Sequence, residues 1–123
     1  MSDVVLVCGG RDYGDYATVC KALERLDVGT ILQGGATGAD RLARRYAGTH
    51  NIPYHTESPD WNEHGEKAGP IRNARMVAMA PDIVLAFPGG SGTADLVRRA
   101  IAARLTTWIL RPDGTRQLNI FAR

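Results

Sequence analysis

Short segments of strand character alternate along the chain with stretches in which apolar side chains recur every three or four residues. The strand segments are residues 4–8, 30–32, 52–56, 83–87 and 106–110, and those at 4–8 and 83–87 are continuously apolar. Continuously apolar strands are typical of a parallel sheet that helices cover on both faces. The order of elements therefore predicts an α/β fold, a doubly wound and mostly parallel sheet with helices on both faces.

Apolar spacing and end signals together define four helices. The first begins after the capping residue Asp15, and the second runs from Asp40 to about His50. A third opens at Gly69-Pro70, and the fourth follows the glycines after residue 87. Their predicted inner faces are Val19, Cys20, Leu23 and Leu26; Leu42, Ala43, Tyr46 and Ala47; Ile71, Ala74, Val77 and Ala78; and Leu96, Val97, Ala100, Ile101 and Leu105. On the third helix, Arg72, Arg75, Met76 and Met79 share another side.

Three segments do not belong to the alternating series of buried strands and helices. Pro53 places the strand at 52–56 at a sheet edge, because proline cannot donate a ladder hydrogen bond. Residues 57–68 are polar and predict a long functional loop or lid. After a Pro-Asp-Gly turn, residues 118–121 could return as a final antiparallel edge strand.

Composition limits the classes of protein that the chain can represent. At 123 residues it fits one domain, 1–123, with an ordinary apolar content of 44%. The formal net charge of +2 is too small to indicate a nucleic-acid binder by itself, since such domains usually have a concentrated basic patch. We expect a cytoplasmic protein with buried free thiols at Cys8 and Cys20, without a signal peptide, a membrane span, a bound metal or a cofactor.

Three glycine-rich stretches follow predicted strands, at residues 9–14, 33–40 and 88–95. In a doubly wound sheet, loops of this kind meet at the carboxyl edge of the strands, where ligands bind. Glycines allow a close approach of the main chain, and helix N-termini offer free N–H groups to an anion such as phosphate. We therefore predict a nucleotide-like ligand, although each glycine pair alone is explained by an ordinary tight turn.

Several common nucleotide and hydrolase motifs are absent. The chain has no G-x-x-x-x-G-K-[ST] loop, which argues against a P-loop NTPase. It also has no G-x-G-x-x-G after the first strand, so a dinucleotide dehydrogenase is not indicated. Gly90-Ser91-Gly92 lacks the spacing of a G-x-S-x-G nucleophile elbow.

The motifs resemble those of the SLOG superfamily, a Rossmann-like group that includes the lonely-guy phosphoribohydrolases and the DprA/Smf proteins. The similarity is greatest to its YspA branch. The matching segments are Gly9-Gly10-Arg11-Asp12, Gly35-Ala36-Thr37-Gly38-Ala39-Asp40, Ala68-Gly69-Pro70-Ile71-Arg72-Asn73 and Pro88-Gly89-Gly90-Ser91-Gly92-Thr93. The resemblance implies a Rossmann-like fold and a nucleotide or nucleotide-derived ligand.

The hydrolase members combine P-G-G-x-G-T-x-x-E with R-K-x-x-M, and they release the base of nucleoside monophosphates. Here Leu96 occupies the position of the glutamate, and Asn73 that of the lysine. A carboxylate can orient water and stabilise charge on the ribose, whereas leucine can do neither. Asp95 is one residue earlier; it either replaces the glutamate, acting with Arg72 in catalysis, or caps the helix or binds a ligand hydroxyl.

The candidate ligand-binding residues all belong to the matching segments. The phosphate contacts are expected from Arg72, whose guanidinium suits oxyanions, and from the glycine loop that precedes the fourth helix. The full set is Gly9, Gly10, Arg11, Gly35, Thr37, Gly38, Asp40, Arg72, Asn73, Gly89, Gly90, Ser91, Gly92 and Thr93. For Thr37 and Asp40, helix capping is an alternative role.

Other polar and aromatic residues allow two interpretations. Tyr13 and Trp61 either stack on a base or anchor their loops. His55 and His64 are interpreted as surface histidines, because neither has a companion at metal-ligand spacing. The arginine runs at 41–45 and 98–99 are interpreted as solvated helix faces.

Three hypotheses for function follow. The first is a sensor or accessory protein that binds a nucleotide or nucleotide-derived ligand at the carboxyl rim of the sheet. The second is an N-glycosidase acting on nucleoside monophosphates, and the third a DprA-like binder of single-stranded nucleic acid, against which the modest charge argues. By analogy with the hydrolase relatives, we also expect a homodimer.

Overall fold

The computed structural model describes residues 2–121, which form six strands, five α-helices and one 3₁₀ helix. The elements are β1 (Asp3–Cys8), α1 (Tyr16–Glu24), β2 (Val28–Gln33), α2 (Ala39–Thr49), β3 (Tyr54–Thr56), α3 (Trp61–His64), η1 (Gly65–Lys67), α4 (Ala68–Ala78), β4 (Ile83–Ala86), α5 (Ser91–Ala102), β5 (Thr107–Leu110) and β6 (Arg116–Asn119).

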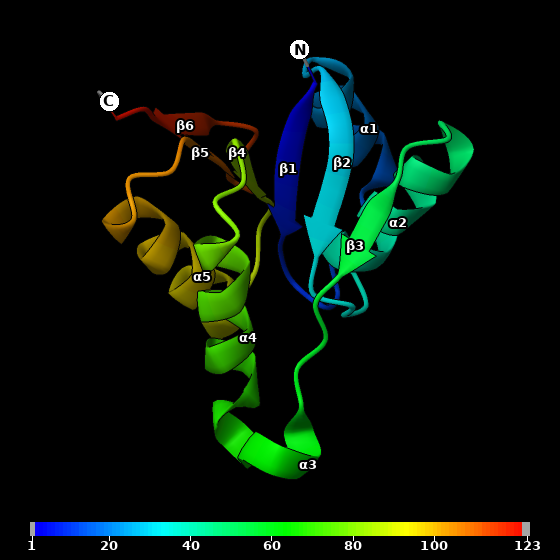
Figure 1. The fold of residues 1–123 in the computed structure, drawn as a ribbon. Helices are drawn as coiled ribbons and strands as arrows, with labels where there is room; N and C mark the ends of the chain where they lie inside the picture. The colour runs from blue at the N-terminus through cyan, green and yellow to red at the C-terminus, as the bar shows by residue number, and fades with distance from the viewer. Residues whose placement is uncertain (1, 122–123) are drawn as a thin grey trace.

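The strands form a single sheet in the order β3-β2-β1-β4-β5-β6 (Figure 1). All neighbouring pairs are parallel except β5–β6, which is antiparallel. This order confirms the doubly wound, Rossmann-like α/β fold. It also confirms the edge position of β3, although that strand begins at Tyr54, after Pro53. The final strand β6 lies two residues earlier than predicted.

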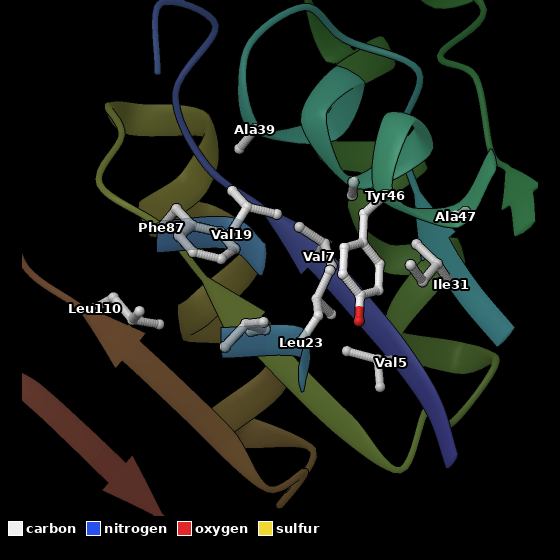
Figure 2. Close-up of a cluster of buried hydrophobic side chains, with 12 residues drawn as sticks. Val5, Val7, Val19, Leu23, Ile31, Ala39, Tyr46, Ala47, Phe87 and Leu110 are labelled. Atoms are coloured by element: carbon white, nitrogen blue, oxygen red, sulfur yellow. The ribbon is translucent and has the colours of Figure 1, made fainter. Parts of the chain in front are cut away.

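Both faces of the central strands are buried against helices. Val5 and Val7 of β1 pack in one core cluster with Val19 and Leu23 of α1 and with residues of α2 (Figure 2). The opposite face of β1 packs with α4 and α5; its cluster comprises Leu6, Cys8, Leu32, Met76, Val84, Ala86, Leu96 and Ala100. The sheet is therefore wound on both sides, as a continuously apolar β1 requires.

Two expectations for the region after β3 are wrong. Residues 57–68 are not simply a loop, because α3 and η1 occupy 61–67 and α3 is capped by the Asp60 carboxylate, which accepts from Glu63 N at 3.0 Å. On α4 the predicted inner and outer sides do not match the structure: Met76 is 2% exposed, while Ala78 is exposed. The buried stripe of α4 also contains Asn73, so apolar spacing pointed to the wrong side.

The two cysteines have no disulfide partner; Cys8 is buried and Cys20 is half-buried. Within residues 2–121, none of the helices has the length and apolar character that crossing a bilayer would need.

Candidate functional site

The site lies where the winding of the sheet reverses. β1 and β4 are neighbours, but the chain leaves β1 toward α1 on one face and leaves β4 toward α5 on the other (Figure 1). Loops that part in this way leave a crevice outside the carboxyl ends of the strands. A cavity of about 760 Å³ opens there, between the end of β1, α4 and the start of α5.

This cavity brings together most of the ligand-binding residues that were predicted from the sequence. It is lined by Gly9, Gly10, Arg11, Asp40, Arg72, Asn73, Gly90, Ser91, Gly92, Thr93 and Asp95. Gly35 and Thr37 instead line a second, adjoining cavity. Gly38 and Gly89 line neither of these two cavities.

The glycines divide into two groups by what surrounds them. A methyl group on Gly9 would lie 2.6 Å from the Ala39 Cβ of α2 and 3.0 Å from the Phe87 Cβ after β4, and one on Gly89 would lie 2.7 Å from the Gly10 amide nitrogen. These glycines therefore allow the loops after β1 and β4 to pack together, and the Gly10 N–H donates to the Pro88 carbonyl at 2.9 Å. At Gly90 and Gly92 an added methyl would meet no atom within 4 Å, so these two face open space at the cavity.

The first turn of α5 presents free backbone donors to this space. Its N-cap is Gly90, which offers no side-chain cap, and the first amide with a partner is that of Ala94, which donates to the Gly90 carbonyl at 3.0 Å. Among the hydrogen bonds of residues 2–121, none uses the N–H groups of Ser91, Gly92 or Thr93. Such N–H groups, together with the helix dipole, attract an anion.

Arg72 and Asn73 of α4 connect three segments by hydrogen bonds. Arg72 Nη1 donates to the Gly34 carbonyl at 2.7 Å, and Arg72 Nε donates to Asn73 Oδ1 at 3.0 Å. Asn73 Nδ2 in turn donates to the Gly92 carbonyl at 3.2 Å and to Asp95 Oδ2 at 3.0 Å. Asn73 is only 4% exposed. Arg72 is thereby held between the loop after β2 and the start of α5.

Burial lowers the pKa of Arg72, and the charges of Arg11 and Arg75 act in the same direction, while Asp40 opposes them. An arginine still remains protonated at neutral pH, so Arg72 presents a fixed positive charge to both cavities. Its Nη2 has no partner among the described residues.

Asp40 ties together the loop after β2 rather than capping α2. One of its carboxylate oxygens, Oδ2, accepts from Gly34 N at 3.1 Å and from Ala36 N at 3.2 Å, while the N-cap position is Gly38 at φ 71°. Asp40 is 6% exposed, and this burial raises its pKa, against the opposing effect of the two N–H donors and Arg72. Thr37 also does not cap α2, because its hydroxyl donates to the Arg11 carbonyl at 3.0 Å.

Asp95 is occupied by its own neighbours. Its carboxylate accepts from Asn73 and from Arg99 Nε at 2.9 Å on one oxygen, and from Arg98 Nη2 at 3.0 Å on the other. Burial alone would raise the pKa of Asp95, but these hydrogen bonds and charges lower it overall. Leu96, at the position where the hydrolase pattern has glutamate, is 1% exposed and belongs to the core.

Sequence reasoning missed Gln33 and Arg44, which support the loop after β2. Gln33 is fully buried; its Oε1 accepts from Gly35 N and from Arg44 Nη1, both at 2.7 Å. Its Nε2 donates to the Thr56 hydroxyl at 2.5 Å. Arg44 also donates to the Ala36 carbonyl, so it is not simply part of a solvated face. A polar residue ending an apolar strand, next to two glycines, is the only sequence signal of this network.

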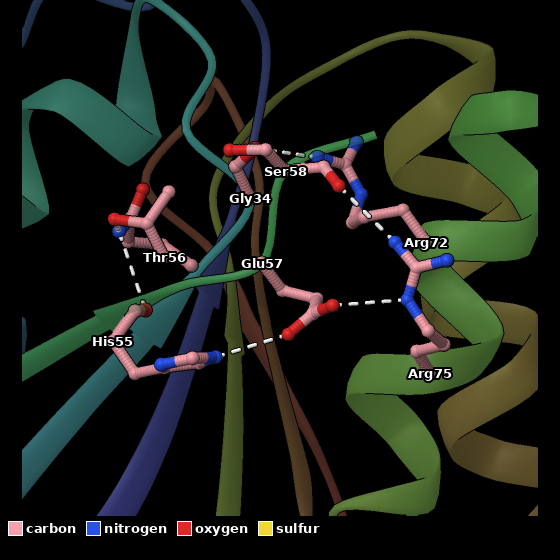
Figure 3. A network of polar contacts seen from close by, with 8 residues as sticks. Gly34, His55, Thr56, Glu57, Ser58, Arg72 and Arg75 are labelled. Atoms are coloured by element: carbon pink, nitrogen blue, oxygen red, sulfur yellow. Dashed lines mark hydrogen bonds and ion pairs between the residues drawn. The ribbon is translucent and has the colours of Figure 1, made fainter. Parts of the chain in front are cut away.

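The second cavity, of about 710 Å³, lies beside the first, and the segment that follows β3 forms one of its walls. That segment is held to α4 by Arg75, which donates to the Glu57 carboxylate at 2.9 Å and to the Ser58 carbonyl at 3.1 Å (Figure 3). The hydrogen bond from His55, assisted by Arg75, keeps the pKa of Glu57 low despite its partial burial.

The two aromatic candidates have different positions. Trp61 is 50% exposed and lines both cavities, which leaves its ring available to a ligand. Tyr13 packs on Phe87 in the core, with ring centroids 5.4 Å apart, so it anchors its loop. Among residues 2–121, no three His, Cys, Asp or Glu side chains are grouped closely enough to hold a metal ion.

Comparison with known proteins identifies a family and a similar phage protein. A sequence model of the YAcAr family, described as the YspA, cpYpsA-related SLOG family, matches residues 3–64. The chain is also similar to the Gene 61 protein of Mycobacterium phage D29, with 39% identity over 108 residues, covering 78% of this chain and 86% of the phage protein.

Proposed function

The chain belongs to the YspA, cpYpsA-related SLOG family, and on that premise we propose that it binds a nucleotide or nucleotide-derived ligand as a sensor or accessory protein. The ligand's phosphate would rest on the first turn of α5. The sugar and base would lie along the ends of β1 and β2. The observation on which this depends is that three N–H groups of α5, without partners among the described residues, open onto a cavity that Arg11 and Arg72 also line.

Arg72 supports this proposal because it is already oriented before any ligand arrives. Two protein acceptors, the Gly34 carbonyl and Asn73 Oδ1, fix the guanidinium and leave its Nη2 free. A donor that is held in place loses less conformational entropy on binding than a mobile one. Gly90 and Gly92 support it as well, because they leave space for a phosphate to approach the main chain.

The geometry favours binding over cleavage of the ligand. A glycosidase needs a carboxylate free to orient water or stabilise the ribose. Asp95 has three side-chain partners and a lowered pKa, which suits a structural ion pair. Leu96 points into the core and supplies no replacement.

The experiment is to denature the purified protein and identify released small molecules by mass spectrometry, followed by calorimetric titration with those found. Binding of a phosphorylated nucleoside, with no free base detected by chromatography after incubation, would support the proposal. Release of base at a rate that Asp95→Asn abolishes would favour the glycosidase instead. Absence of any bound nucleotide, together with no binding of nucleoside mono- and diphosphates at millimolar concentration, would contradict both.

We further propose a homodimer in the cytoplasm. The dimer is suggested by the hydrolase relatives, and Ala78 and Met79 at the end of α4 leave apolar surface exposed that a second copy could cover. The free thiols of Cys8 and Cys20 fit a reducing compartment. Sedimentation velocity at micromolar concentration tests the dimer, and a monomer there would contradict it.

A further inference from the structure

From the two adjoining cavities we infer that the ligand is a nucleoside diphosphate extended on its β-phosphate by a neutral, hydroxyl-rich group, which occupies the second cavity. This inference rests on the proposed function, because it assigns the nucleoside and its phosphate to the first cavity. It adds an occupant for the cavity that Ser58 and the loop after β2 enclose.

The two cavities meet at a shared border. Both are lined by Arg11, Ala36, Trp61 and Arg72, while α4 and α5 contribute to the first and residues 34–37 and 58–59 to the second. Each cavity by itself lies in the range of volumes that hold a small organic ligand. A mononucleotide in the first cavity would leave the second empty, and a ligand that uses both must cross the border.

The two arginines at the border have guanidinium donors without hydrogen-bond partners among the described residues. Arg72 has Nη2 free, and the side chain of Arg11 has no hydrogen-bond or ion-pair partner among residues 2–121. The two guanidinium groups are close enough for the charge of Arg11 to lower the pKa of Arg72. Two adjacent guanidinium groups fit a diphosphate, because it has negatively charged oxygens on two neighbouring phosphorus atoms and each group can bind one of the phosphates.

The lining of the second cavity indicates a neutral polar group beyond that diphosphate. Apart from the two border arginines, it contains no charged side chain; the loop backbone at 34–36, the hydroxyls of Thr37 and Ser58, Pro59 and the Trp61 ring form its walls. Backbone amides and hydroxyls suit hydrogen bonding to a sugar, and an exposed indole suits stacking on its apolar face. A cationic extension would find no carboxylate among these residues, and an acidic one would compete with the diphosphate for the same two arginines.

The test compares matched ligands that differ only in the extension. Isothermal titration is performed with AMP against ADP-ribose and with UMP against UDP-glucose. We expect the extended member of at least one pair to bind about tenfold or more tightly than its monophosphate. Equal affinities within both pairs would overturn this inference while leaving the proposed function intact. No binding of any of the four would overturn the proposed function itself.

Two variants locate the extension. Ser58 is exposed, lines only the second cavity, and holds Arg75 through its carbonyl rather than its side chain. Ser58→Phe should fill the cavity and remove most of the gain from the extension, with monophosphate affinity unchanged within about twofold. Ser58→Ala, which leaves the cavity open, should keep most of the gain. If Ser58→Phe weakened binding of the monophosphate by the same factor as binding of the extended ligand, a separate binding region for the extension would be refuted.

Discussion

Gly92→Ala should make the protein more stable while lowering its affinity for the ligand. Gly92 lies in the first turn of α5 and lines the first cavity, and an added methyl would meet no protein atom within 4 Å. Replacing a helical glycine by alanine without a clash stabilises a protein by about 0.4–1 kcal/mol. For a domain of this size that corresponds to a rise in Tm of roughly 2–5 °C.

The same methyl would stand beside the free N–H groups where we place the phosphate. If the phosphate is displaced by the width of a methyl group, its hydrogen bonds to those N–H groups lengthen or break. We expect affinity for a nucleoside monophosphate to fall at least about tenfold, or about 1.4 kcal/mol. A gain in stability with a loss in binding is informative, because damage to the fold would lower both quantities.

Gly48→Ala provides the matched control. Gly48 lies within α2, its added methyl would also meet nothing within 4 Å, and it lines neither cavity. Thermal unfolding should show a rise comparable to that of Gly92→Ala, and calorimetry should show unchanged affinity. Wild-type affinity in Gly92→Ala would refute the assignment of the phosphate to the first turn of α5.

Three further outcomes are expected. Asn73→Leu should lower the free energy of unfolding by about 1–3 kcal/mol, measured by urea titration, because it removes the hydrogen bonds that the buried Asn73 makes to Arg72 of α4 and to Gly92 and Asp95 of α5. The lowered pKa of Asp95 means that its carboxylate stabilises the fold above its unfolded pKa of about 3.9, and that this stabilisation disappears as the pH falls through the folded pKa. Asp95→Asn should therefore lower Tm at pH 7, and the difference from wild type should shrink below about pH 4; a difference independent of pH would contradict this. Burial raises the pKa of the Cys8 thiol, so a thiol reagent at pH 8 should label Cys20 in the native protein and Cys8 only after unfolding, as peptide mapping would show.

The sheet could be predicted because its strands are apolar on both faces, and only a doubly wound arrangement buries such strands. α4 could not be predicted correctly from the same rule. Its buried stripe combines Met76 with Asn73 and the half-buried Arg72, so the most apolar side of the helix is not the side that faces the sheet. Polar residues can occupy a buried stripe only where partners exist, and those partners come from residues 34, 92 and 95. These contacts depend on tertiary structure and leave no periodic signal.

The glycine loops were predicted to meet at one rim, but their separate roles were not. Gly9 and Gly89 are required by the packing of one loop against another, whereas Gly90 and Gly92 border empty space. All four have the same sequence context of small residues after a strand, so only the positions of neighbouring atoms distinguish them. The distinction has a direct consequence for mutagenesis. Alanine at Gly9 or Gly89 would test the fold, and only alanine at the second pair can test the ligand.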